Sequence, residues 1–177
     1  MGKARKAEGS RDASPIALAA AVADRVEIRD VRLIRCACHQ SPQAVHIRKF
    51  NAKLHRHSRV QIDESKNTIA VIAHFEFTCQ DTEHPADGDP DFHVSADFLV
   101  LYTAKSLSGL TKLNFEKFGE LNGTYNAWPY WREFLHNTMS RMALKPFLLP
   151  VFRITARAQE AKRYAGTKRK RVSPATE

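Results

Sequence analysis

The chain has 177 residues, of which 43% are hydrophobic and 27% charged, proportions that suit one globular domain with tails and exclude fibrous and fully disordered classes. The longest uninterrupted apolar run, residues 16–23, is mostly alanine and falls far short of the roughly 20 residues that a membrane-spanning helix needs, so we expect no membrane insertion. The formal net charge is +9, but residues 1–15 carry +2 and residues 157–177 carry +5, so the body is nearly neutral and the ends are basic.

The N-terminal segment, residues 1–24, is expected to be a flexible basic arm that leads into a short Ala-rich helix. The basic residues ahead of this helix are also typical of the start of a secretory signal peptide, but Glu8, Asp12 and Pro15 interrupt that pattern of basic and then apolar residues. We therefore take residues 25–156 as the folded domain and residues 157–177 as a basic C-terminal helix and tail.

Four segments of the body predict strands. The first, residues 25–38, loses its apolar alternation between Ile28 and Val31 and again after Leu33, which predicts a strand with a bulge. A short strand is expected at residues 59–63, followed by a turn. Two segments alternate most regularly and lie on either side of a loop rich in acids and prolines. These two are residues 68–79 and 92–102.

Helical spacing replaces the alternation after the last strand. A helix over residues 111–121 is expected to stop at Asn122 and Gly123, since this pair is a helix C-terminal signal. Asn126 is expected to cap a second, amphipathic helix with Pro129 in its first turn.

Beyond this second helix we expect a linker over residues 147–152 and a last, mostly polar helix over residues 155–164. Strands therefore come first and helices afterwards. That order predicts an α+β domain with an antiparallel sheet and helices on one face.

Cysteine and histidine residues raise the question of a metal site. Cys36, Cys38 and His39 are ligand types that zinc prefers, but zinc sites usually separate paired cysteines by two residues, and the chain has no second pair. We therefore interpret both cysteines as buried apolar residues of a strand. His55 and His57 share a strand face, but the sequence has no carboxylate next to them that could complete a metal site. We expect no metal and no cofactor, and the odd count of three cysteines favours a reducing, cytoplasmic location.

Motifs for catalysis are missing from the sequence, which has no nucleophile elbow, no phosphate-binding glycine loop and no HExxH helix. Glu116 and Glu120 share a helix face, but an exposed pair at this spacing is typical of solvated surface. We therefore expect that the protein is not an enzyme.

Large aromatic residues crowd around the helix start at residues 125–134. Trp128, Tyr130 and Trp131 cannot all lie on one helical stripe, so either one ring is exposed beside ordinary core packing or several rings face a partner. Together with the basic ends, exposed rings could stack on nucleic-acid bases, which makes nucleic-acid binding the alternative function. The basic run 168–171 attracts phosphates, lipid surfaces or acidic proteins without specifying one of them, and it also suits a solubilising tail.

The sequence GTYNAWPYWRE over residues 123–133 resembles the helix start of the SecB protein-export chaperones and their SecB-like relatives, including those associated with toxin–antitoxin systems. The resemblance continues through Arg141 and the Leu-Pro-Val of residues 149–151. The strands at residues 60–63, 68–79 and 91–102 resemble strands of the family, so the resemblance covers roughly residues 25–154.

This resemblance implies a four-stranded antiparallel sheet with helices, assembled as a dimer of dimers. It also implies an ATP-independent holdase that binds unfolded or precursor polypeptides, for protein export or for a toxin–antitoxin client. Export members are acidic and dock on the translocase ATPase SecA, whereas this chain is basic with a basic tail. The basic charge therefore disfavours docking on SecA without excluding it, and an antitoxin is as good a candidate client as an export precursor.

Two sets of site residues follow by position from the resemblance. The client-binding set comprises Phe75, Phe77, Val100, Tyr102, Trp128, Trp131, Phe147, Leu148, Leu149 and Phe152. The set expected at subunit contacts comprises Phe92, Val94, Ala96, Phe98, Tyr130 and Phe134.

Overall fold

The computed structural model describes residues 13–42, 44, 47, 49–83, 89–145 and 147–154. The expected polar helix at residues 155–164 and the basic tail lie outside these residues. The elements, in chain order, are α1 (Pro15–Ala23), β1 (Val26–Gln40), β2 (Phe50–Asp63), β3 (Thr68–Asp81), β4 (Phe92–Ala104), α2 (Lys112–Phe118), a π-helical segment (Gly119–Gly123) and α3 (Thr124–Arg141).

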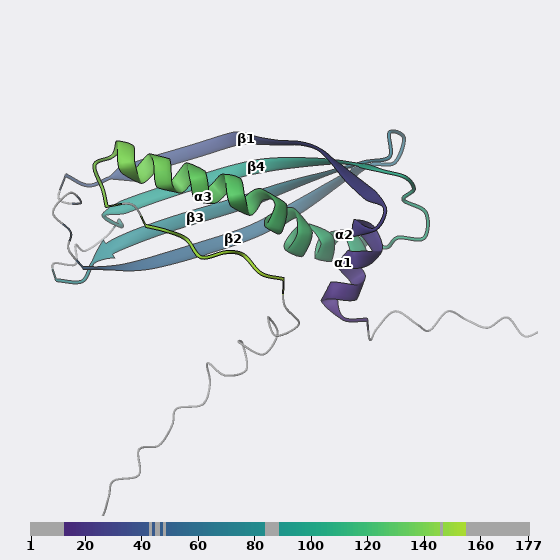
Figure 1. Cartoon of the computed structure of the whole chain (residues 1–177), viewed down its shortest axis with the longest axis horizontal. Coiled ribbons are helices and arrows are strands. Elements are labelled where there is room, and N and C mark those ends of the chain that lie inside the picture. Colours follow the sequence, from purple (N-terminus) through teal and green to yellow (C-terminus); the bar gives the residue numbers. More distant parts are fainter. Residues whose placement is uncertain are drawn as a thin grey trace, which may run out of the picture.

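The four strands form one antiparallel sheet in the order β1-β4-β3-β2, so β1 and β2 are its edges. Helix α3 lies along one face of the sheet, and α1 and α2 lie near one end of it (Figure 1). The expected α+β class, with a four-stranded antiparallel sheet and helices on one face, is therefore confirmed. Among the described helices, none is long and apolar enough to cross a membrane.

Strand β1 carries two breaks in its register with β4, between Ile28 and Asp30 and between Leu33 and Arg35. The expected bulge is confirmed, and the strand has two such register shifts rather than one. Each bulge adds one residue to β1, so the side chains that follow it change faces relative to an unbroken strand.

Strand β2 is much longer than the expected strand at residues 59–63, because it pairs with β3 all the way from Phe50 to Asp63. It is an edge strand whose side chains are mostly exposed. Its backbone hydrogen bonds to β3, rather than burial of alternating apolar residues, keep residues 50–58 extended. That is why a search for apolar alternation misses them.

The expected helix stop at Asn122 and Gly123 is wrong, because α2 runs through the π-helical segment directly into α3. Asn126 consequently lies inside α3 rather than at its cap. A Cβ atom on Gly119 would lie 2.4 Å from Cγ2 of Val60, and one on Gly123 would lie 2.4 Å from Cγ1 of Val71. The two glycines therefore let the helical segment approach β2 and β3 closely, and do not end a helix.

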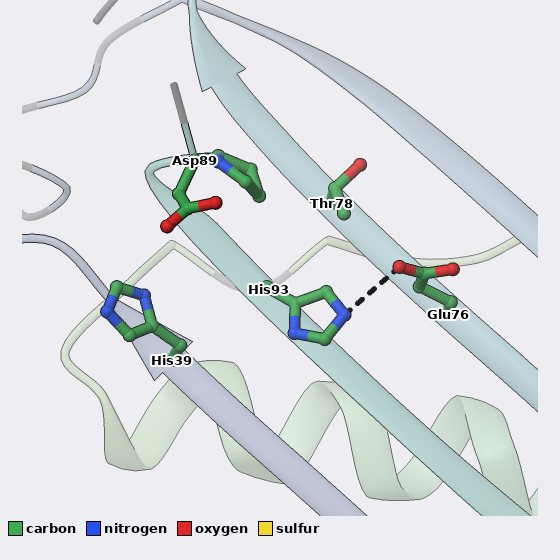
Figure 2. Close-up of a pocket in the computed structure, with 6 residues that line it drawn as sticks. His39, Glu76, Thr78, Asp89 and His93 are labelled. Carbon is green, nitrogen blue, oxygen red and sulfur yellow. Dashed lines mark hydrogen bonds and ion pairs between the residues drawn. The ribbon is translucent and has the colours of Figure 1, made fainter. Parts of the chain in front are cut away.

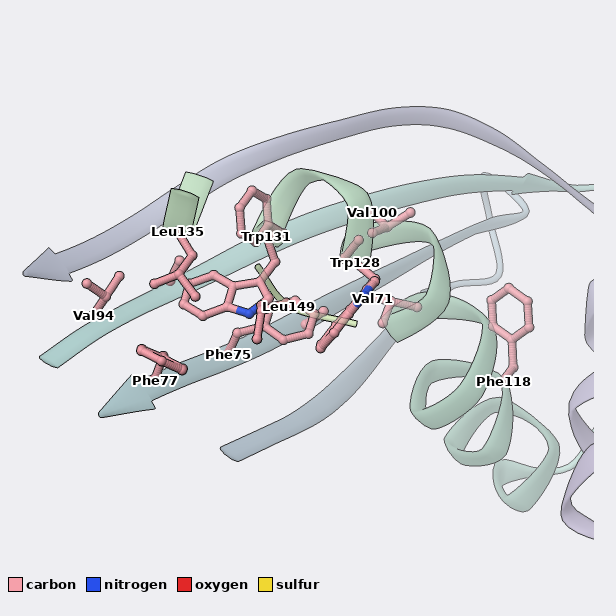
Figure 3. Packing of buried hydrophobic residues seen from close by; sticks show 14 of the residues in the cluster. Val71, Phe75, Phe77, Val94, Val100, Phe118, Trp128, Trp131, Leu135 and Leu149 are labelled. Carbon is pink, nitrogen blue, oxygen red and sulfur yellow. The ribbon is translucent and has the colours of Figure 1, made fainter. Parts of the chain in front are cut away.

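The core fills the space between α3 and the strands beneath it (Figure 3). At its centre the rings of Phe75 and Trp131 stack with centroids 5.4 Å apart and planes 8° apart. Helix α1, the expected Ala-rich helix, adds Val22 to this core, and Asn114 Nδ2 donates a hydrogen bond to the Leu18 carbonyl at 3.0 Å. Helix α1 therefore packs against the domain that the sequence analysis begins at residue 25.

Candidate functional site

Most residues of the expected client-binding set lie in the core of the single chain. They join β3 and β4 to α3 or to the linker, so a polypeptide bound at the surface does not touch them in this conformation. The buried members are Phe75, Phe77, Val100, Tyr102, Trp128, Trp131 and Leu149. Phe147 and Phe152 are half-buried, and only Leu148 is largely exposed.

The segment that follows α3, residues 147–154, runs past β2 and is held by two side chains of α3 (Figure 1). Trp128 Nε1 donates a hydrogen bond to the Pro150 carbonyl at 2.9 Å, and Arg132 Nε donates one to the Leu149 carbonyl at 3.0 Å. At the start of the segment, the ring of Phe147 stacks on Phe77 with centroids 5.4 Å apart. These contacts fix the backbone of the linker in one orientation.

This fixed linker presents apolar side chains outward. Leu148 and Val151 are 73% and 64% exposed, the largest exposures among the large hydrophobic residues described. Phe152 packs against Trp128 with ring centroids 5.5 Å apart and against Tyr125 at 6.4 Å. We call Tyr125, Leu148, Val151 and Phe152 the linker surface.

An arginine of β2 borders the linker surface. The Arg56 guanidinium carbon lies 4.7 Å from the centre of the Phe152 ring, a cation–π contact, and burial lowers the pKa of this guanidinium. This contact brings the linker surface to β2, whose outer edge has no further strand in the described part of the chain. Apolar side chains and a free strand edge therefore lie beside each other.

A second apolar surface lies on the β1 side of α3. Ile28 and Leu33 are half-exposed although they share a sheet face with the core, because Ile28 pairs in register with Tyr102 and Leu33 with Phe98. Phe134 packs edge-on against Phe98, with centroids 6.3 Å apart. Tyr130, one helical turn before Phe134, is 46% exposed. We call this the β1 surface and define it by Ile28, Leu33, Tyr130 and Phe134.

The residues expected at subunit contacts divide between core and surface. Tyr130 and Phe134 reach the β1 surface, whereas the β4 residues of the set are covered within the same chain. A contact between subunits through the β4 residues stays a prediction. The covered residues are Phe92, Val94, Ala96 and Phe98.

The aromatic cluster of residues 125–134 is mostly core. Trp128 and Trp131 are buried, so they are not available as stacking platforms for nucleic-acid bases. Tyr125 and Tyr130 are the exposed rings. Of Trp128, Tyr130 and Trp131, only Tyr130 is exposed, which agrees with core packing plus one exposed ring.

The face of the sheet opposite α3 carries a polar network that sequence reasoning missed. Asp97 on β4 is buried, and its two carboxylate oxygens contact His74 Nδ1 on β3 at 2.5 Å and Arg35 Nη2 on β1 at 2.8 Å. The ring of His57 on β2 lies 4.5 Å from that of His74. A carboxylate therefore does lie among the histidines. Only the strand register, which the sequence does not reveal, brings these residues together.

The same open face holds a hollow of about 420 Å³ near the ends of β3 and β4 (Figure 2). In it His93 Nε2 lies 3.1 Å from Glu76 Oε1. Within the described residues, no three histidine, cysteine, aspartate or glutamate side chains are grouped so that they could hold a metal ion. The polar lining is a poor match for apolar segments of a polypeptide. It comprises His39, Glu76, Thr78, Asp89, Pro90 and His93.

The expectation that both β1 cysteines are buried is wrong. Cys36 and Cys38 are exposed, and only Cys79 on β3 is buried. The reason is the position of β1, since it is an edge strand and α3 packs mainly against β4 and β3.

Comparison with known proteins identifies a likeness in structure but none in sequence. No protein-family model and no curated protein matches the chain. The SecB-like chaperone Rv1957 of Mycobacterium tuberculosis, solved in complex with a ChAD peptide from the HigA1 antitoxin, matches with a TM-score of 0.67 at 20% identity, covering 78% of this chain and 98% of that chain. A protein of unknown function from Streptococcus agalactiae matches with a TM-score of 0.40 at 10% identity, covering 71% and 96%. The first likeness shows that the chain has a SecB-like fold.

Proposed function

We propose that this protein is a chaperone of the SecB-like kind that holds unfolded polypeptide segments without using ATP. One observation carries the proposal, namely the fold shared with a SecB-like chaperone whose structure contains an antitoxin peptide. We propose no catalytic reaction and no cofactor, and we place the protein in the cytoplasm.

The linker surface and the outer edge of β2 are the proposed client site. An extended client segment could add its backbone hydrogen bonds to a free strand edge and rest its side chains on Leu148 and Val151. At about 25 cal/mol per Å², burial of a few hundred Å² of apolar surface contributes several kcal/mol before the cost of ordering the client. Such binding is sufficient to hold a segment and weak enough to release it.

The client proposed first is an antitoxin-like polypeptide. The structural neighbour binds a peptide of that kind, and the net charge of +9 does not suit docking on SecA. A precursor for export is the second client, and the two are distinguished by testing each as a substrate.

The β1 surface is proposed as a contact with a second copy, within a homo-oligomer built as a dimer of dimers. Its apolar side chains are left half-exposed, and a second copy would cover them. A solution mass of about four chains would support this assembly, whereas a strict monomer would contradict it.

The chaperone proposal is tested by aggregation of a chemically denatured protein diluted into buffer without ATP. We expect the full chain to suppress light scattering at near-stoichiometric ratio. The double variant Leu148→Asp, Val151→Asp should lose most of this activity, because it places charges on the linker surface. Leu113→Asp on α2 is the matched control, since Leu113 is also an exposed apolar residue but lies outside this surface. No suppression by the full chain over a wide range of ratios would overturn the proposal.

A further inference from the structure

Strand β1 carries two exposed thiols on one face. Cys36 pairs in register with Ala96 and Cys38 with Val94, and both partners belong to the buried face of β4. The two sulfur atoms therefore project from the same side of the strand, two residues apart. The chain's third cysteine, Cys79, is 5% exposed and far less accessible.

The backbone around these thiols has few constraints. Among the described strands, β1 forms ladder hydrogen bonds with β4 alone. The two cysteines lie between the bulge at Leu33 and Arg35 and the last residue of the strand, Gln40. A local bend there would break a few backbone hydrogen bonds to one neighbour and leave the rest of the sheet paired.

We propose that Cys36 and Cys38 are a redox-responsive pair that closes into a reversible disulfide under a peroxide oxidant. One thiolate attacks an oxygen of the peroxide, which breaks the O–O bond and yields a sulfenic acid and, after protonation, water. The second sulfur then attacks the sulfenic sulfur, so that the S–S bond forms, the S–O bond breaks and a second water leaves. The two thiols together lose two electrons, and hydrogen peroxide accepts them. This chemistry does not depend on the proposed chaperone function.

The geometry of an extended strand makes this disulfide strained. Alternate residues of a strand have Cα atoms roughly 6.6 Å apart, given a rise of about 3.3 Å per residue. Disulfides prefer a Cα separation of about 5.5–6 Å and rarely exceed about 6.8 Å. Closure therefore pulls the backbone together and loosens the pairing of Cys36 and Cys38 with β4. A strained, exposed disulfide is readily reduced, as a reversible switch requires.

The test treats the full chain with hydrogen peroxide under native conditions and identifies the product by intact mass and peptide mapping. We expect a mass lower by two hydrogen atoms, a bond joining Cys36 to Cys38, and full reversal by a reducing agent. Hydrogen exchange of the amides at residues 36–40 should become at least about tenfold faster after oxidation, while the amides of β2 stay unchanged.

Cys79 is the internal control. Burial raises the pKa of its thiol to about 12 from an ordinary value of 9.0, so its thiolate fraction near neutral pH is about a thousandfold lower. The variant Cys79→Ser should therefore form the same disulfide as the wild type. Cys36→Ser and Cys38→Ser should each lose it and stop at a sulfenic acid or its further oxidation products.

Three outcomes would overturn the proposal. They are separate oxidation of both thiols without an S–S bond, a disulfide that joins only different chains, and a disulfide that involves Cys79. None of them bears on aggregation suppression, so failure of the redox proposal is distinguishable from failure of the chaperone proposal.

Discussion

Nδ1 of His74 lies 2.5 Å from Oδ1 of Asp97, on the face of the sheet that no described helix covers. The Asp97 side chain is nevertheless only 3% exposed, and its second oxygen contacts Arg35 Nη2 at 2.8 Å. Each carboxylate oxygen thus has a hydrogen-bonding partner on a neighbouring strand, which offsets the cost of burying the charge. The pair and its arginine connect β3, β4 and β1 across the sheet.

We expect Asp97→Ala to lower the free energy of unfolding by about 1–3 kcal/mol, since it leaves His74 without its partner and removes the bridge between strands. Urea unfolding followed by circular dichroism measures this loss. Arg35→Gln is the comparison variant and should cost less than about 1 kcal/mol, because the Arg35 side chain is mostly exposed. An equal cost for the two variants would show that Asp97 does not organise the network.

The close approach of the helical segment to the sheet at Gly123 gives a second prediction. Gly123→Ala should destabilise the fold by about 1–3 kcal/mol, because the added methyl group meets Val71 at 2.4 Å and the core cannot absorb it. The double variant with Val71→Ala should recover part of this loss, since it removes the obstructing methyl groups. Thermal unfolding of both single variants and the double variant measures the coupling. Additive effects would contradict the steric explanation.

The buried hydroxyl of Tyr102 leads us to expect a lower free energy of unfolding at alkaline pH. Burial raises the pKa of its hydroxyl from 10.0 to about 12, although the hydrogen bond donated by Asn126 Nδ2 at 2.9 Å acts in the opposite direction. Between about pH 10 and 12 the folded chain thus retains a proton that the unfolded chain releases, so the free energy of unfolding falls as pH rises through this window. Cys79, whose pKa is raised to about 12, acts with the same sign from about pH 9 upward.

The measurement for this third prediction is the urea midpoint at about pH 8 and about pH 11. Tyr102→Phe should lose less stability over this interval than the wild type, since the phenyl ring has no proton to release. A wild type and variant with the same pH dependence would contradict the assignment.

The hydrogen bond from Arg132 Nε to the Leu149 carbonyl predicts that α3 holds the linker surface in place. Arg132→Ala should make residues 147–154 several-fold more susceptible to limited proteolysis, because it removes one of the two bonds that fix this backbone. His136→Ala is the control, since His136 is exposed on the same helix. Equal cleavage rates for the wild type and Arg132→Ala would show that the linker is held by packing alone.

The sequence by itself determined the two most regular strands and which of their faces is buried. Strict alternation at residues 68–79 and 92–102 marks strands with one covered face, and the slips after Ile28 and Leu33 coincide with the two register shifts of β1. These features are local, because the side chains of a strand alternate between faces whatever the neighbouring strand is.

Only the tertiary structure decided which residues are exposed and which are in close contact, because these features depend on the strands and helices that pack against a segment. Gly123 follows Asn122 in a pair that is typical of a helix C-terminus, yet its role is to let the helical segment approach the sheet closely, because Val71 of β3 lies against it. Cys36 and Cys38 have the sequence of a buried strand, yet they are exposed because β1 is an edge strand of the sheet. Likewise, Trp128 and Trp131 are buried by the same sheet that leaves the linker surface open. Burial at these positions is decided by strand order and helix placement, which arise from contacts between residues far apart in the chain.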